Sequence, residues 1–110
     1  AYRFAGATGV NDGGAVPGPA LRLEQNAPNP FNPATTLAYV LPERMRVRLA
    51  IYDVAGRQIA VLHDGARAAG RHTVRWNGTD AAGRPASAGV YCARLQAGGE
   101  MRLTKLVLVR

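Results

Sequence analysis

The amino-acid sequence predicts an all-β protein with the architecture of a seven-stranded antiparallel immunoglobulin-like β-sandwich. Short apolar runs with a period of two are separated by turn-forming residues, and no stretch repeats its apolar residues with a helical period. The pattern is clearest where Val47, Leu49 and Ile51 alternate with Arg and Ala, and it resumes on a return strand at Ile59, Val61 and Leu62. This predicts a β-hairpin. Because a lone hairpin is unstable in water, the remaining strands must cover its apolar face.

The turn of this hairpin has a chemistry that the sequence repeats. Asp53 can accept a backbone N–H at the first position of a type I turn, and Gly56 can adopt the positive φ that closes it. The pattern Asp-x-Ala-Gly-Arg that begins at Asp53 recurs from Asp80, with Gly83 in the place of Gly56. We therefore interpret all four residues as structural turn residues.

The other strands follow from the same alternation. They are expected at 21–23, 36–41, 72–76, 89–96 and 100–110. The side chains expected to face inward on three of them are Leu37, Tyr39, Leu41, His72, Val74, Trp76, Tyr91, Ala93 and Leu95. We expect a small-residue loop at 65–70 and a tight turn at 97–99. The last strand is apolar on both faces after Lys105, so alternation does not assign its inner side. Either both sides are covered, or one side is left for a partner.

A proline-rich segment at 26–33 cannot be a central strand, because its three prolines lack an N–H donor. We expect it to cross one end of the sandwich, with Phe31 closing the end of the core. Residues 1–20 are rich in Gly, Pro and Ala and are interpreted as a linker or the end of a preceding domain, with the sandwich at 21–110. The chain starts without Met or a signal segment, so we expect it to be a piece of a longer protein. Its apolar runs are too short to span a bilayer.

Fourteen basic residues against seven acidic residues give a net charge of +7. Two readings of this charge are open: solvated surface, or a face that binds anions such as nucleic acid or acidic polysaccharide. The arginines are spread along the chain and form no run, which favours solvated surface and no nucleic-acid partner.

No arrangement typical of an enzyme or of a cofactor site is found. Asp53 and Asp80 are explained by their turns, His63 and His72 lack metal-ligand spacing, and Ser87 lies in no nucleophile elbow. A calcium site at Asn77 and Asp80 is conceivable, but the clustered acidic residues that calcium prefers are absent. Cys92 is the single cysteine, so no intrachain disulfide can form. We expect no catalytic residue, no metal and no cofactor.

A carbohydrate-binding β-sandwich module, of the kind carried by secreted glycoside hydrolases, is a rival interpretation. Such modules usually need a platform of exposed aromatic rings. Trp76 and Tyr91 are expected in the core, which leaves Tyr52 as the one strand aromatic expected to point outward.

Five ordered motifs give the chain a family resemblance. They are Asn29-Pro30-Phe31-Asn32-Pro33 with Thr35, Ile51 to Arg57, Trp76 to Asp80 with Gly83-Arg84-Pro85, Ser87 to Tyr91, and Lys105 in an apolar terminal strand. Over residues 21–110 the sequence resembles the C-terminal sorting domains of type IX (Por) secretion cargo. It also resembles the immunoglobulin-like domain of the flagellar hook-capping protein, from the same superfamily.

The resemblance implies a non-catalytic C-terminal module that directs secretion across the outer membrane and attachment to the cell surface. Its partners would be the outer-membrane secretion translocon and sorting machinery, and an N-terminal cargo domain in the same parent chain would reach the surface through the periplasm. A hook-capping role is the alternative. The sorting motif maps onto Gly89, Tyr91, Lys105 and Arg110, while Cys92 and Ala93 depart from the larger residues common in relatives. Independently of the family, a terminal edge strand with flanking cations can be recognised by β-augmentation.

Overall fold

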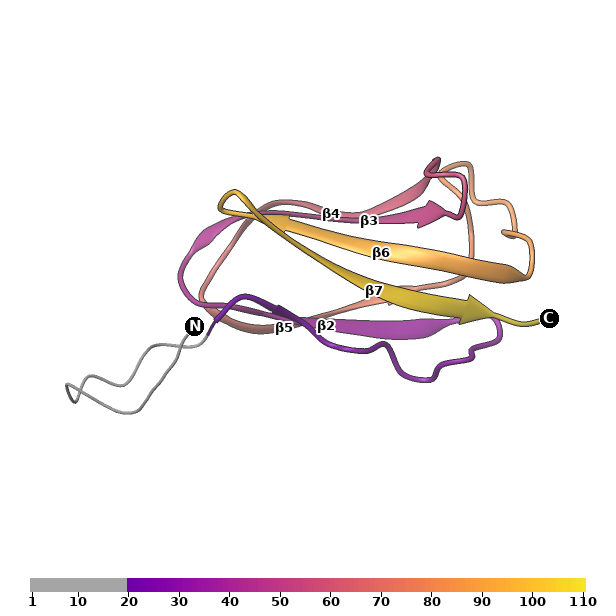
Figure 1. Cartoon of the computed structure of the whole chain (residues 1–110), viewed down its shortest axis with the longest axis horizontal. Coiled ribbons are helices and arrows are strands. Elements are labelled where there is room, and N and C mark those ends of the chain that lie inside the picture. The colour runs from indigo at the N-terminus through magenta and orange to yellow at the C-terminus, as the bar shows by residue number, and fades with distance from the viewer. Residues whose placement is uncertain (1–19) are drawn as a thin grey trace.

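The computed structural model describes residues 20–110, which form seven strands and no helix (Figure 1). The strands are β1 (Arg22–Leu23), β2 (Thr35–Leu41), β3 (Met45–Asp53), β4 (Gln58–Arg67), β5 (Gly70–Trp76), β6 (Gly89–Ala97) and β7 (Glu100–Leu108). All pairings between them are antiparallel. The predicted all-β sandwich of immunoglobulin-like type is confirmed. The predicted linker at 1–20 lies, except for its last residue, outside the described residues.

The strands form two sheets, ordered β1-β2-β5 and β4-β3-β6-β7. Figure 1 shows the two sheets facing each other as two layers, with β7 at the edge of the larger one and, in this view, between β6 and the smaller sheet. The terminal strand is therefore an edge strand, with one neighbour, β6, within its sheet. Within residues 20–110 there is no helix with the length and apolar composition needed to cross a membrane.

The core lies between the inward faces of the two sheets. The predicted inward faces of β2 and β6 are confirmed, because Leu37, Tyr39, Ala93 and Leu95 are all completely buried. On β5 the alternation is also present, but only Trp76 is fully enclosed. The structure assigns the inner side of β7, which the pattern left open: Leu106 and Leu108 are buried, with Val107 half-buried between them.

The predicted loop at 65–70 is wrong, because β4 continues to Arg67 and only residues 68 and 69 lie between β4 and β5. The long strand β3 supplies the reason. Its first residues pair with this segment, Met45 opposite Arg67 and Val47 opposite Gly65. Ladder hydrogen bonds to an existing partner strand outweigh the weak strand preference of Gly and Ala.

Val61, in the apolar pattern of β4, points away from the core. Its side chain is 42% exposed, while Ala60 is buried in its stead. The pairing of β3 with β4 shifts register between Leu49 and Ala50 and again between Ile51 and Tyr52. Each such bulge inserts an extra residue and moves the following side chains to the other face of the sheet.

The proline-rich segment closes one end of the sandwich, as predicted. Phe31 is 1% exposed, and its ring packs against Trp76 with 5.6 Å between ring centroids. Two buried polar groups fix the segment, because Asn26 donates to the Thr35 hydroxyl (2.9 Å) and that hydroxyl donates to the carbonyl of Pro28 (2.8 Å). The segment is thus held by its own hydrogen bonds as well as by the core.

Candidate functional site

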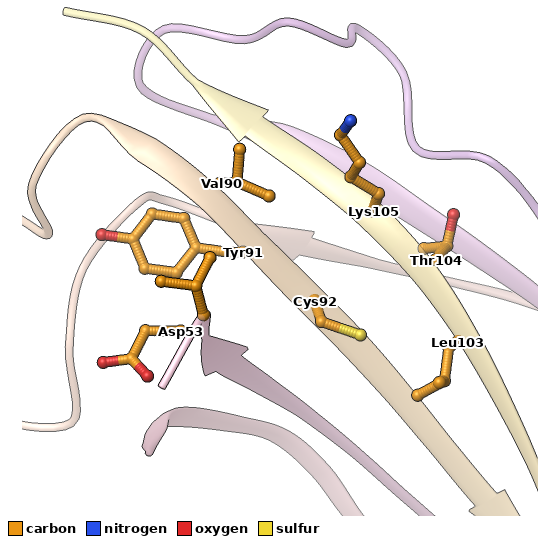
Figure 2. A pocket seen from close by; sticks show the side chains of 8 residues that line it. Asp53, Val90, Tyr91, Cys92, Leu103, Thr104 and Lys105 are labelled. Atoms are coloured by element: carbon orange, nitrogen blue, oxygen red, sulfur yellow. The ribbon is translucent and has the colours of Figure 1, made fainter. Parts of the chain in front are cut away.

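A shallow groove of about 240 Å³ lies over β6 and β7 on the outer face of the larger sheet (Figure 2). Strand register sets which side chains share this face, since Cys92 pairs with Lys105 and Val90 with Val107. The walls include Val90 and Leu103, which are 41% and 59% exposed, and Val54 from the β3–β4 turn. Three exposed apolar side chains close together form an accessible apolar patch.

Lys105 is the cation of this groove. It is exposed, and no carboxylate of residues 20–110 lies within ion-pair distance of its ammonium group. Asp53 also lines the groove, but its carboxylate is bonded to the side chain of Arg57 at 3.0 Å. The groove therefore carries an uncompensated positive charge.

Most acidic groups of the described chain are already occupied. The carboxylates that form an ion pair with an arginine are Glu24, Asp53, Asp64, Asp80 and Glu100. The remaining acidic residue between 20 and 110 is Glu43, in the turn between β2 and β3. Within residues 20–110, Glu43 is therefore the only acidic side chain without an arginine partner, and it forms no ion pair with Lys105.

Arg110 is placed differently from Lys105, although both belong to the motif taken from the resemblance. Its Nε donates to the carbonyl of Ala86 (2.8 Å) and its Nη2 to the carbonyl of Gly78 (3.0 Å). These carbonyls belong to the chain between β5 and β6, so Arg110 ties the C-terminus to that connection. Its observed contacts are structural.

Gly89 and Tyr91 are structural as well. Tyr91 is 7% exposed, packs edge-on against Trp76, and donates its hydroxyl to the carbonyl of Ser87 four residues upstream. This is the arrangement of the tyrosine corner of immunoglobulin-like sandwiches. Gly89 has φ of +151°, a backbone conformation that side-chain-bearing residues rarely adopt, and it lies opposite Leu108. The four motif residues thus lie on β6, on β7 and at the chain end. Of these four, only Lys105 is both exposed and part of the groove.

The edge of β7 is divided into a covered and an open part. Near its C-terminal end the N–H of Phe31 donates to the carbonyl of Val107, and the N–H of Val109 donates to the carbonyl of Phe31, both at 2.9 Å. The N–H of Val107 donates to the side chain of Asn29 at 3.0 Å. The proline-rich segment therefore lies along β7 like a short parallel strand. No feature of the sequence predicted this pairing.

The two Asp turns have the same geometry. The Asp53 carboxylate accepts the N–H groups of Ala55 (3.0 Å) and Arg57 (2.9 Å), and Gly56 has φ of +84°. At the second turn the Asp80 carboxylate accepts two backbone N–H groups two and four residues on, and Gly83 has φ of +81°. The hydrogen bond from the backbone N–H of the turn arginine is the main reason why the pKa of each carboxyl is lowered. Within residues 20–110 no three His, Cys, Asp or Glu side chains gather closely enough to hold a metal ion.

Tyr52 points outward as expected, but its ring is not an open platform. The Arg94 guanidinium lies 4.1 Å from the ring centroid, and Arg48 donates to the Tyr52 hydroxyl at 3.0 Å. Trp76 and Tyr91 are both buried. Among the Phe, Tyr and Trp residues of the described chain, Tyr52 alone is not buried, and Arg94 lies over its ring. Sequence alternation placed Tyr52 outside correctly but could not show that an arginine from β6 covers it.

Comparison with known proteins places the chain in a family. The sequence model of the FlgD Ig-like domain family matches residues 32–100. Dimeric latent PorU from Porphyromonas gingivalis is similar in structure, with a TM-score of 0.67 and 21% identity over 93% of this chain and 10% of that chain. PorZ, a surface component of the type IX secretion system of the same organism, has a TM-score of 0.54 and 20% identity over 82% of this chain and 11% of its own.

A third similar structure belongs to another class of protein. The alkylpurine DNA glycosylase AlkC of Pseudomonas fluorescens, bound to DNA containing an abasic site analogue, has a TM-score of 0.50 and 16% identity over 82% of this chain and 30% of its own. No curated protein matches the chain. At these identities the three structures establish the fold alone, and this chain spans at most about a third of each. Because the family model covers more than half of the sequence, the protein belongs to the FlgD Ig-like domain family.

Proposed function

We propose that this domain is a non-catalytic sorting module, which directs a cargo protein across the outer membrane by type IX secretion and to the cell surface. The observation that carries the proposal is Lys105, an unpaired cation in an apolar groove beside the open edge of the terminal strand. A receptor can reach this group without unfolding the core, because both the side chain and the strand edge are at the surface.

Two further observations support the proposal. The five ordered motifs resemble those of type IX sorting domains, and two of the similar structures belong to proteins of type IX secretion. In this role the domain would follow an N-terminal cargo domain and be recognised by the translocon and sorting machinery after passage through the periplasm.

A hook-capping role is the second candidate, and the family match favours it, because the matching model is that of the FlgD Ig-like domain. The resemblance places both kinds of module in one superfamily. The two candidates differ in what the domain must contact, a secretion translocon in one case and a flagellar hook in the other. A secretion assay separates them.

The assay attaches the chain to the C-terminus of a reporter that carries a periplasmic signal peptide, in a bacterium with a type IX system. We expect the reporter to reach the surface or the medium, and to stay in the periplasm when the translocon gene is deleted. Retention in the periplasm with the translocon intact would refute the sorting role, as would export that does not depend on the translocon.

Variants then locate the signal. Lys105→Ala should fold normally but accumulate in the periplasm, since Lys105 forms no ion pair and exposed charges contribute little to stability. Arg44→Ala is the matched control, because it removes a charge from the exposed turn between β2 and β3, away from the groove. If both variants are exported equally well, Lys105 is not the signal.

Arg110→Ala must be tested separately from Lys105→Ala. Loss of its two hydrogen bonds to backbone carbonyls should lower the free energy of unfolding by about 1 to 2 kcal/mol. If Arg110→Ala loses both stability and export, the loss of export is therefore attributed to impaired folding and not to a lost recognition contact. A normal unfolding curve for Arg110→Ala would show that the two bonds do not hold the chain end.

A further inference from the structure

The edge of β7 already accepts an added segment in one place. Asn29 and Phe31 supply hydrogen bonds to Val107 and Val109, so this part of the edge is paired within the chain itself. Val107 lies opposite Val90 at a position of the ladder where both backbone groups point away from β6. The pairing shows which residues of β7 turn their N–H and C=O groups outward.

The same alternation identifies the open part of the edge. Met101, Leu103 and Lys105 precede Val107 at steps of two without a break in register, so their backbone groups also point away from β6. The carbonyl of Met101 accepts a bond from the side chain of Arg102, and the carbonyl of Lys105 accepts one from the side chain of Gln25, each at 3.0 Å. No hydrogen bond from residues 20–110 reaches the N–H or C=O of Leu103 or the N–H of Lys105. β1 of the other sheet lies close to β7 but forms no ladder with it. Backbone groups left unpaired at a sheet edge are a template for another strand.

The side chains beside this open edge define what could add to it. Leu103 is 59% exposed and Met101 is 50% exposed, so apolar surface flanks the backbone groups. Lys105 brings a positive charge for which the described chain has no carboxylate within reach. A second copy of the chain would bring a second Lys105 and a further net charge of +7. Charge complementarity therefore favours an acidic partner over self-association.

We propose that the edge of β7 at Met101–Lys105 accepts an extended acidic strand from a partner protein, which hydrogen-bonds to Leu103 and Lys105 and packs an apolar side chain beside the groove. Main-chain bonds would supply affinity, while the carboxylate opposite Lys105 and the apolar contact with Leu103 would supply specificity. The inference deepens the proposed function, because it names the chemistry of the partner that would recognise the sorting domain.

The test uses a capped hexapeptide in which glutamate and valine occupy alternate residues of one face with threonine between them (Glu-Thr-Val-Thr-Glu-Thr), and the whole chain labelled with ¹⁵N. We expect shifts of the Leu103 and Lys105 amide signals and slower hydrogen exchange at both. Cys92 gives an independent local readout, because it is the single cysteine and lines the groove. The bound peptide should slow its alkylation by iodoacetamide. Unchanged exchange and alkylation at a peptide concentration of 1 mM would overturn the proposal.

Charge reversal provides the sharper comparison. Lys105→Glu should weaken binding of the glutamate–valine peptide by about threefold to tenfold and favour a lysine–valine peptide instead. Arg44→Glu makes the same change of charge in the turn between β2 and β3 and should leave binding unchanged. Equal weakening by both variants would mean that net charge, and not this edge, governs binding, which would refute the proposal.

Leu103→Pro tests the backbone contribution. The variant removes an N–H that is bonded to no described residue, and proline is tolerated at strand edges, so the fold should survive. Binding should fall about tenfold or more. If the variant unfolds, Lys105→Glu and the Cys92 readout still decide the question. Peptide binding without export of the reporter would refute the sorting role and leave this inference standing, while export without peptide binding would do the reverse.

Discussion

Replacing Phe31 with Ala should destabilise the domain strongly, because this ring closes the end of the core. The ring is 1% exposed, lies 5.6 Å from the ring centroid of Trp76, and belongs to the largest fully buried side chains. Removing a buried Phe ring generally costs about 3 to 5 kcal/mol through lost transfer free energy and the cavity left behind. Phe31→Leu keeps most of the apolar volume and should cost about 1 to 1.5 kcal/mol.

Urea unfolding followed by Trp76 fluorescence measures both changes, since Trp76 is the single tryptophan and lies against the altered ring. Val54→Ala is the control. Its side chain is 84% exposed, so the free energy of unfolding should change by no more than about 0.5 kcal/mol. A loss of less than about 1 kcal/mol for Phe31→Ala, or an equal loss for Val54→Ala, would refute the assignment of Phe31 to the core.

Two further predictions concern the repeated turns. A Cβ atom at Gly56 would meet no other atom within 4 Å, so Gly56→Val should cost about 1 to 2 kcal/mol through backbone strain at φ of +84° alone, while Arg84→Ala should stay within about 0.5 kcal/mol. Equal melting temperatures for Gly56→Val and the unchanged protein would contradict this. The pKa of the Asp53 and Asp80 carboxyls is lowered in the folded protein, so the ionised carboxylates stabilise the fold at pH values above the unfolded pKa of 3.8. This stabilisation is lost as pH falls through the lower pKa values of the folded state. Chemical unfolding between pH 2 and 6 should therefore show stability falling below about pH 4, and the double variant Asp53→Asn, Asp80→Asn should show a smaller fall; an equal fall in both proteins would count against the turn bonds.

The parts of the fold that sequence predicted well depend on neighbouring residues. Alternation along β2 and β6 identified their buried faces, because every second residue is buried along β2 and, after Gly89, along β6, whereas most residues between them are at least partly exposed. Proline chemistry likewise excluded 26–33 from the sheet interior and left Phe31 to close the core. These inferences needed only the local order of residue types.

The features that the sequence did not predict arose where pairing with a distant strand determines the structure. Gly65 belongs to a strand because Val47 lies opposite, and Val61 points outward because β4 contains bulges against β3. Neither partner can be read from the residues around 61–65. In the same way, Asn29 bonds to Val107 over 78 residues of sequence, so the partial closure of the β7 edge had no local signal.

The same distinction separates the two basic residues of the C-terminal motif. In the sequence Lys105 and Arg110 are equivalent, each a cation beside an apolar run. In the structure Arg110 is bonded to two backbone carbonyls from the connection between β5 and β6, whereas Lys105 faces a groove with no carboxylate partner. Arg110, which is bonded within the fold, can be required for export because the fold requires it. Lys105 has no partner within the described chain, so a requirement for it points to a contact with another molecule. The consequences of Lys105→Ala and Arg110→Ala for stability therefore determine how any effect of either variant on secretion is to be interpreted.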